Sequence, residues 1–335
     1  MWVIPHREFK SLPLRHSSIR YIIDIIMKKI LSTIVIIVLA ATVYSFIPVV
    51  GLYFEKGPAP YTNDEAAGKL KANKGDYFEF IVLGDNHAGF LFNDSTTLKL
   101  IRSINREGRF KKAPIDFAII SGDLTFRGSA WDYRIYNKIR SLIKLPVISA
   151  VGNHDYDKGG GALFKKYAAE GEFSFADRNS YFIFIDNAIG NMTDAQFFRF
   201  EEDLKKSSDY AHRFVIMHKP ATSPYFQSWY RPERNPWSYR FMKLCERYKV
   251  DIVFSGHEHM FNEKTFGGVK YIVSAGGGMP PNIPDFDGGF LHYLVVRVRG
   301  DYVDYEVRRI FPPAWEYLTL YMWKDAFYFL KNVLS

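Results

Sequence analysis

Short runs of β-forming residues recur from residue 77 onward, and a polar cluster follows almost every one of them. The first run is YFEFIVL at 77–83, which changes abruptly into GDNH. Later runs are DFAIISG, LPVISAVG, YFIFIDN, HRFVIMH, VDIVFSG and KYIVSAGGG, and several are almost continuously apolar, as strands buried on both faces are. Helix-like segments such as STTLKLIRSINREGR, SAWDYRIYNKIRSLI and TDAQFFRFEEDLKKS lie between some of these runs, with Thr193 as a candidate N-cap. The alternation predicts an α/β fold, and GFLHYLVVRV with YVDYEVRRI predicts a closing antiparallel hairpin.

The polar clusters at the ends of these runs share side chains that can bind metal ions. They are Asp85-Asn86-His87, Gly122-Asp123, Gly152-Asn153-His154-Asp155, His218 and Gly256-His257-Glu258-His259. Open α/β sheets place their sites at the carboxyl ends of strands, so these residues can converge although they are far apart in sequence. Taken alone, Asp85 and His87 favour a simple turn cap over a metal site. Five such clusters at successive strand ends favour a metal site.

In order and type, the clusters resemble the motifs of the calcineurin-like metallophosphoesterases. The family motifs GDxH, GDxx, GNHD, a lone His and GHxH stand here as GDNH, GDLT, GNHD, MHKP and GHEH. SGDLTFRGSAWDY followed by LPVISAVGNHD is most similar to the branch that contains class III cyclic-nucleotide phosphodiesterases. The resemblance implies a four-layer αββα sandwich that holds two metal ions.

The resemblance also implies a role for each residue of the motifs. Carried over position by position, it assigns the first metal to Asp85, His87 and His259, the second to Asn153, His218 and His257, and a bridging position to Asp123. Mixed carboxylate and imidazole ligands accept Mn, Fe, Zn or Co, and the lack of thiolate ligands disfavours a structural zinc. The identity of the two divalent or mixed-valence ions stays open. Phe126 stands where purple acid phosphatases carry a tyrosine ligand, so their coloured iron site is not expected.

The implied reaction is the hydrolysis of phosphate mono- or diesters. In the family, a hydroxide held between two cations attacks the phosphorus, because the metals depress its pKa. The resemblance gives His154 the task of protonating the leaving oxygen or stabilising the transition state, and we expect Asp155 to orient its ring. A catalytically inactive metal-binding scaffold on the same fold, or a nuclease, are the alternatives.

The net charge bears on the nuclease alternative. The formal charge is +8, and residues 1–29 hold six basic against two acidic residues, which accounts for half of it. The remaining chain has no lysine-rich stripe, so no nucleic-acid partner is expected.

Two regions could contact the substrate. Arg127 could reach a phosphate oxygen, although an exposed turn arginine would look the same in sequence. The segment PATSPYFQSWYRPERNPWSYRF follows His218 and could form a wall or lid, or simply pack as a long loop. Its candidate contacts are Trp229, Tyr230, Arg231 and Arg234.

The N-terminal region has no charged residue between Lys29 and Glu55. About 20 apolar residues cross a bilayer as a helix. We therefore expect a short basic tail at 1–29, with Met1 or Met27 as the start, and a transmembrane signal anchor at 30–54. The basic residues precede this segment, which predicts a single-pass protein with its catalytic domain outside the cytoplasm. Signal cleavage and secretion are the alternative.

The remaining boundaries follow from composition. Residues 55–76 are expected to be a linker, 77–311 the metallophosphoesterase domain, and 312–335 a C-terminal amphipathic helix rich in aromatic residues. That helix could lie in a membrane interface, or dock on the domain or on a second subunit. Two membrane contacts would make a lipid-linked phosphate a reasonable substrate. The oligomeric state stays open.

Overall fold

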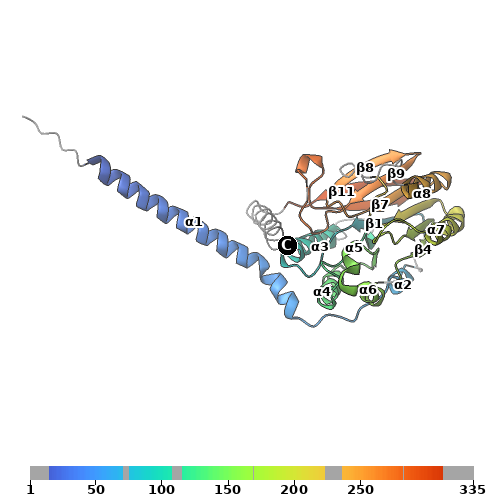
Figure 1. Cartoon of the computed structure of the whole chain (residues 1–335), viewed down its shortest axis with the longest axis horizontal. Helices are drawn as coiled ribbons and strands as arrows, with labels where there is room; N and C mark the ends of the chain where they lie inside the picture. Colours follow the sequence, from blue (N-terminus) through green and yellow to red (C-terminus); the bar gives the residue numbers. More distant parts are fainter. Residues whose placement is uncertain are drawn as a thin grey trace, which may run out of the picture. The chain divides into compact units, whose positions relative to one another are not determined.

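The protein is described from a computed structural model, which covers residues 15–70, 75–107, 115–168, 170–222, 236–281 and 283–311. The chain divides into two compact units, Met1–Ile47 and Pro48–Ser335. In its described part the first unit is helical and belongs to α1 (Arg15–Phe54), whose last residues already form part of the second unit. Figure 1 labels the elements.

The second unit contains two β-sheets among its described residues. The first sheet has the order β11 (Tyr302–Arg309), β10 (His292–Arg299), β1 (Tyr77–Leu83), β2 (Ile115–Ile120) and β3 (Val147–Ser149). The second has the order β4 (Phe173–Asp177), β5 (Ser180–Phe184), β6 (His212–Ile216), β7 (Ile252–Ser255), β9 (Val269–Ser274) and β8 (Phe261–Phe266). Strands β1, β2 and β3 are parallel, as are β5, β6, β7 and β9. The predicted closing hairpin is β10–β11.

Helices cover the outer face of each sheet. The helices of this unit are α2 (Asn63–Gly68), α3 (Leu91–Glu107), α4 (Ala130–Ser141), α5 (Asn153–Tyr156), α6 (Gly161–Tyr167), α7 (Asp194–Lys206) and α8 (Pro236–Arg247), with short 3₁₀ turns at Asp157–Gly159, Ser207–Asp209 and Asp285–Asp287. One buried cluster joins the first sheet to α3, α4 and α6, and another joins the second sheet to α7 and α8. A third lies between the two sheets. The layers therefore run helix, sheet, sheet, helix.

Phenylalanines dominate the contact between the two sheets. Phe80 of β1 is fully buried and stacks on Phe117 of β2, with ring centroids 5.1 Å apart. Across the interface its ring meets the rings of Phe182 and Phe214 edge-on, at 5.4 and 5.3 Å. Edge-to-face aromatic pairs add to the hydrophobic contribution of such large side chains. This cluster sets the position of one sheet against the other.

Local sequence explains where several helices begin. Thr193 caps α7 as predicted: its side chain accepts a hydrogen bond from the backbone N–H of Gln196, and the backbone N–H of Thr193 donates to the side-chain oxygen of Gln196. Ser129 and Asp132 form the same reciprocal arrangement at the start of α4. Such capping boxes satisfy backbone donors that the first turn of a helix leaves free. Two strands, β4 and β8, were not predicted.

The predicted transmembrane signal anchor at 30–54 is wrong. No helix in the described part of the chain combines the length and the hydrophobicity needed to cross a membrane. The expected single-pass topology, with the catalytic domain outside the cytoplasm, is wrong for the same reason. Part of the charge-free run has a different role, because Val49 and Leu52 are buried in the second unit and Lys138 Nζ donates to the carbonyl of Leu52 at 2.9 Å.

Two other predicted segments are the linker at 55–76 and the C-terminal helix at 312–335. The expected linker at 55–76 carries α2, and Asn63 exchanges two hydrogen bonds of 2.9 Å with the backbone of Ser149 in β3. The expected C-terminal helix at 312–335 lies outside the described residues.

We expect Phe80→Ala to lower the free energy of unfolding by about 3–5 kcal/mol, because it opens a cavity between the two sheets. Urea unfolding followed by circular dichroism measures this loss. Phe198→Ala is the matched control, since that side chain on α7 is 67% exposed and its removal should cost less than about 0.5 kcal/mol. Equal losses in the two variants would contradict the central place given to the inter-sheet cluster.

Candidate metal centre

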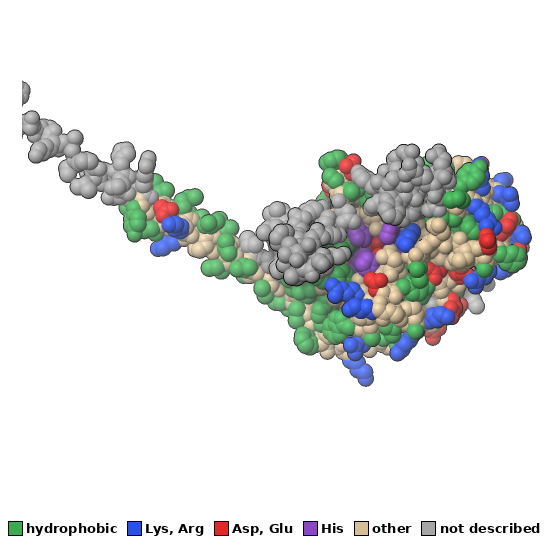
Figure 2. All heavy atoms as spheres, viewed as in Figure 1, with side chains coloured by type: hydrophobic (Ala, Val, Ile, Leu, Met, Phe, Trp, Pro, Cys, Tyr) green, Lys and Arg blue, Asp and Glu red, His purple; other side chains and the backbone are tan. Residues whose placement is uncertain are grey.

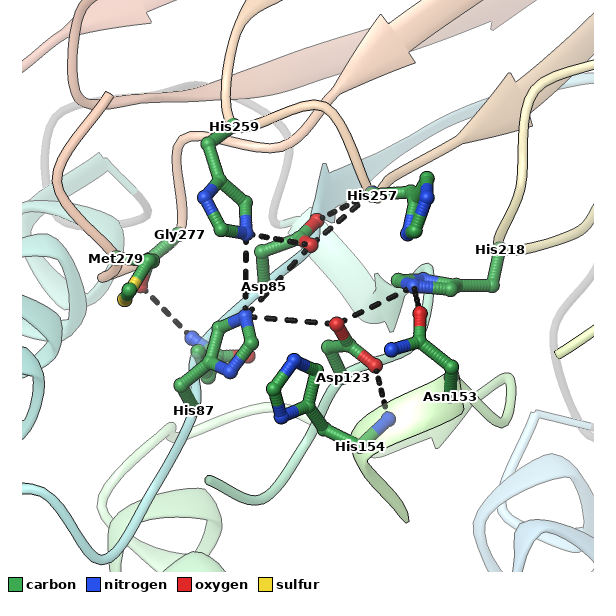
Figure 3. Close-up of polar contacts among 12 residues, drawn as sticks. Asp85, His87, Asp123, Asn153, His154, His218, His257, His259, Gly277 and Met279 are labelled. Atoms are coloured by element: carbon green, nitrogen blue, oxygen red, sulfur yellow. Dashed lines mark hydrogen bonds and ion pairs between the residues drawn. The ribbon is translucent and has the colours of Figure 1, made fainter. Parts of the chain in front are cut away.

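The predicted ligands lie at the carboxyl ends of parallel strands from both sheets (Figure 3). Asp85 and His87 follow β1, Asp123 follows β2, and Asn153 begins α5 just after β3. From the other sheet, His218 follows β6, while His257 and His259 follow β7. Because the ends of these strands meet, residues separated by up to 174 positions in the chain become neighbours. The convergence expected from the strand-end pattern is present.

Four of these residues form a first group of donors. The Nε2 atoms of His87 and His259 lie 3.2 Å apart, and Asp85 Oδ1 lies 3.4 Å from His259 Nε2. Asp123 Oδ2 completes the group at 3.5 Å from His87 Nε2. Asp85, His87 and Asp123 are buried, His259 is partly buried, and the donor atoms of all four lie within 4.8 Å of one another.

Asp123 also belongs to a second group, with His218 and His257. His218 Nε2 lies 3.3 Å from Asp123 Oδ2 and 3.0 Å from the amide oxygen of Asn153. The same carboxylate oxygen therefore faces both groups. With Asn153 beside the second group, the two groups account for every residue that the family resemblance assigns to a metal; that each one is a ligand stays a prediction.

The donor spacing suits metal ions. Ligands about 2.1 Å from a cation lie about 3.0–3.4 Å from one another in tetrahedral or octahedral geometry. The closest donor pairs are spaced by 3.0–3.5 Å, and no sulfur takes part. His218 Nδ1 lies 3.0 Å from the carbonyl oxygen of Ser121, to which it can donate, which leaves Nε2 directed at the site. The residues fit divalent cations.

The backbone at the site is unusual. Asp85, His87, Asp123, His257 and His259 all have positive φ, between 48° and 75°. Residues with a Cβ seldom adopt this left-handed conformation, and each instance costs on the order of 1–3 kcal/mol. Such strain concentrates at functional sites, where the surrounding structure holds it in place. The strained positions coincide with the predicted ligands.

Glycines in the motifs allow close approach between the loops. Gly122 has φ of 98°, and a Cβ there would lie 2.5 Å from His218 Nδ1. A Cβ on Gly152 would lie 2.1 Å from the backbone nitrogen of Asp123. The glycine that precedes the aspartate or asparagine in these motifs is therefore required by packing at the site.

The electrostatics of the site centre on Asp123. Burial alone would raise its pKa, but the charges of His218 and His87 outweigh burial and hold the pKa well below its ordinary value. Burial lowers the pKa of His218, but Asp123 opposes it and raises that pKa to about 9. Burial lowers the pKa of His87, and it lowers the pKa of His257 to about 3. Without metal, both ring nitrogens of His218 therefore stay protonated at neutral pH. A metal ion bound at Nε2 would displace the proton there.

His154 lies beside the first group. Its ring centroid is 4.6 Å from that of His87, and its backbone N–H donates to Asp123 Oδ1 at 2.9 Å. Its Nδ1 lies 2.8 Å from the carbonyl oxygen of Phe126, the partner that orients the ring. The imidazole keeps Nε2 available, as a group that handles a proton requires.

The expected role of Asp155 is corrected by the structure. Its buried carboxylate does not orient His154; it accepts hydrogen bonds from the backbone N–H groups of Leu124, Thr125 and Gly152. Neighbouring residues on a helical turn point in different directions, so Asp155 faces away from the ring of His154. Burial, and then the charge of Asp123, raise the pKa of Asp155 to about 7. Asp155 is a positioning residue that joins the loop after β2 to the loop after β3.

Of the residues predicted to contact the substrate, the structure describes only Arg127. Arg127 is exposed, and its guanidinium lies 5.0 Å from the ring centroid of Phe126, near His154. Trp229, Tyr230, Arg231 and Arg234 lie outside the described residues.

Two residues near the site were missed. Asn187, three residues after β5, is buried, and its side-chain oxygen accepts from the backbone N–H groups of His218 and Lys219, both at 3.1 Å. Lys219 is half-buried, and burial lowers its pKa while Asp123 opposes that effect. A polar residue at the end of YFIFIDN was the available signal for Asn187, and the position after His218 was the signal for Lys219. Figure 2 shows basic side chains close to the histidines that reach the surface.

The sequence profile described as calcineurin-like phosphoesterase matches residues 78–261, more than half of the chain. The chain belongs to this family. It is 27% identical over 196 residues to a probable cyclic nucleotide phosphodiesterase of Vesicomyosocius okutanii, which covers 57% of this chain and 80% of that protein. It is 26% identical over 156 residues to a probable cyclic nucleotide phosphodiesterase of Xenorhabdus bovienii, covering 43% and 61%.

A solved structure of GAP50, the anchor in the inner membrane complex of Plasmodium, shares the fold. Its TM-score is 0.51 at 14% identity, with 70% of this chain and 85% of that chain covered. The predicted resemblance to the calcineurin-like family and its cyclic-nucleotide phosphodiesterase branch is confirmed by the profile and the two relatives. This calcineurin-like phosphoesterase is a metal-dependent phosphoric ester hydrolase that uses divalent metal ions.

We expect Asp155→Ala to lower the free energy of unfolding by about 3 kcal/mol or more, because several buried donors would lose their acceptor. Asp157→Ala is the matched control: its carboxylate is more than half exposed, and we expect a loss below about 0.5 kcal/mol. Urea unfolding of both variants measures the difference. A loss in Asp155→Ala as small as in the control would show that this carboxylate does not hold the two loops together.

Proposed function

We propose that this phosphoesterase is dinuclear and that Asp123 bridges its two metal ions. The observation that carries the proposal is the shared oxygen: Asp123 Oδ2 lies 3.5 Å from His87 Nε2 and 3.3 Å from His218 Nε2. The first ion would be held by Asp85, His87 and His259 with Asp123, and the second by Asn153, His218 and His257 with Asp123. When bound, such a pair supplies a hydroxide nucleophile at neutral pH and polarises the phosphoryl oxygens of a phosphate mono- or diester.

The chain's own side chains would complete the reaction. His154 has its Nδ1 occupied by the carbonyl of Phe126 and its ring beside His87, so Nε2 can deliver a proton to the leaving oxygen. Asp155 would act indirectly, through the loops that carry Asp123 and Asn153. Arg127 is placed near His154 and could contact the leaving group.

The substrate and metal assignments extend from the family. The names of the two curated relatives make cyclic nucleotides one class of diester to test, beside simple mono- and diesters. Mn, Fe, Zn and Co all accept these ligands. The argument for a lipid-linked substrate has lost its basis, because it rested on two membrane contacts: one is corrected above, and the other lies outside the described residues.

The same set of phosphate esters, with DNA and RNA added, tests the two alternative functions, an inactive scaffold and a nuclease. Metal-loaded protein that turns over no phosphate ester would indicate an inactive metal-binding scaffold. Turnover confined to DNA or RNA would indicate a nuclease, and sensitivity to salt would support that assignment.

We expect Asp123→Asn to reduce the bound metal by more than the loss of one ion, because both donor groups share this carboxylate. Elemental analysis after dialysis against Mn²⁺ or Zn²⁺ measures the number of metal equivalents. His259→Ala is the comparison, since it alters the first group only and should leave close to one equivalent. Two full equivalents in Asp123→Asn would contradict the bridging role.

We expect His154→Ala to lower kcat by about 10²–10⁴-fold, as is typical for the loss of a general acid, while the metal content stays close to that of the wild type. Turnover of p-nitrophenyl phosphate and bis(p-nitrophenyl) phosphate, with parallel metal analysis, checks both. Lys158→Ala, an exposed change on the same loop, serves as the control. If metal and activity fall together in His154→Ala, the residue is a ligand and not an acid.

A further inference from the structure

The last residues of α1 belong to the second unit, and one of them is linked to the loop that carries His87. Tyr53 is partly buried, and its hydroxyl donates to the carboxylate of Asp94 in the first turn of α3. The two residues are 41 positions apart in the chain, so the contact ties the end of α1 to the start of α3. Tyr53 is neither a predicted ligand nor a residue expected to handle a proton, and the contact needs a different explanation.

Asp94 holds the turn that follows His87. It is fully buried, and its two carboxylate oxygens accept from the backbone N–H of Gly89 at 3.1 and 3.2 Å. A buried carboxyl group needs such partners, because burial without hydrogen bonds is costly. Gly89 lies two residues after His87, a member of the first group of donors. The hydroxyl of Tyr53 and the loop of His87 therefore share one buried acceptor.

The conformation of the His87 loop shows why this support matters. The N–H of His87 donates to the carbonyl of Asp123 at 3.0 Å, which ties the loop to the next one. At Gly89 the pattern changes: φ is 101°, and the N–H donates to Asp94 instead. His87 has a φ of 48°, a conformation that a residue with a Cβ keeps only where its surroundings hold it. Asp123 provides that hold at His87 itself, and Asp94 provides it two residues later.

Helix α4 fixes the other end of this link. The ring of Tyr53 meets the ring of Trp131 edge-on, with centroids 5.5 Å apart. The carbonyl oxygens of Leu52 and Tyr53 accept from Lys138 Nζ, at 2.9 and 3.3 Å. Since both its ring and its backbone are held, Tyr53 offers Asp94 a donor with little freedom to move, as a support for a functional site requires.

We propose that Tyr53 is a positioning residue for the first metal ion, and that it acts through the carboxylate of Asp94 to hold the loop that carries His87. The proposal rests on the proposed function, since it takes from there the assignment of His87 to that ion. It adds a residue outside the metal-ligand set, and it gives the end of α1 a part in the metal centre.

The first test measures the affinity for each metal ion. We expect Tyr53→Phe, which removes the hydroxyl and keeps the ring, to weaken the binding of one ion by about 3–10-fold and to leave the other unchanged. The loss should be smaller than the roughly 10–100-fold typical of a residue that touches a ligand directly, because Tyr53 acts through Asp94 and Gly89. Equilibrium dialysis of the metal-loaded full chain against buffered Mn²⁺, followed by elemental analysis, measures both affinities.

Tyr248→Phe is the matched control. Its hydroxyl donates to the carboxylate of Glu201 at 3.1 Å, so this change also removes one hydrogen bond between a tyrosine and a carboxylate, on the helices of the other sheet. It should alter neither affinity. A merely structural role for Tyr53 would lower the free energy of unfolding and leave both affinities at the wild-type values, as in the control. That result would overturn the proposal.

The second test asks whether Asp94 carries the effect. Asp94→Asn should weaken the same ion, and it tests the link by itself if Tyr53→Phe does not fold. The double variant should bind that ion within about twofold of Asp94→Asn alone, because changes in one hydrogen-bonded chain are not additive. Losses that multiply would show that Tyr53 acts by another route, and they would overturn the role given to Asp94.

His259→Ala separates the two ions and the two proposals. In that background, which should hold the second ion alone, Tyr53→Phe should leave the remaining affinity unchanged; a loss of about threefold or more would contradict the assignment to the first ion. If the wild type holds a single ion, the dinuclear function fails, and weaker binding of that ion in Tyr53→Phe still supports the role of Tyr53. If the wild type holds two ions and Tyr53→Phe binds both equally well, the role of Tyr53 is overturned and the proposed function stands.

Discussion

The metal centre depends on polar side chains being held on strained backbone where two sheets end together. Five predicted ligands have left-handed φ, a conformation that a free loop would leave. Hydrogen bonds between loops hold them: Asp85 accepts from the N–H of His257 in the other sheet, and Asp123 accepts from that of His154. Those bonds form only if the strand ends of the two sheets lie next to each other. The phenylalanine cluster around Phe80 fixes that position of one sheet against the other. The geometry of the metal centre therefore depends on the packing of the core between the two sheets.

Much of this could be predicted from the sequence, because the relevant signals are local. Continuous apolar runs indicate buried parallel strands, and a polar residue at the end of such a run marks the functional edge of the sheet. Strand β8 escaped prediction because its residues FNEKTF are largely polar and only partly buried, as is common on an edge strand. The role of Asp155 was wrong for a geometric reason, since being adjacent to His154 in sequence separates the two side chains on the turn of α5.

The N-terminal segment shows the limit of a composition argument. Residues 30–54 contain no charged residue and are long enough to cross a bilayer as a helix, which was the criterion for predicting a membrane segment. Two residues at the end of that stretch serve the protein's own core instead: Val49 and Leu52 are buried, and the carbonyl oxygen of Leu52 accepts a hydrogen bond from the ammonium group of Lys138. Only the tertiary structure reveals those partners, because Lys138 lies on α4 and is 86 residues away in the chain.

The ligand set alone does not choose a substrate. The seven residues proposed to bind two cations would present the same net charge to any phosphate ester, so the choice between esters would have to come from side chains around the metals. The described part of this chain places one such group, His154, beside the first set of donors. His154 acts on the leaving oxygen, whose proton demand depends on the alcohol. Under the proposed function, His154 would therefore affect how fast the bond to a given alcohol breaks, without any change in the metal ligands themselves.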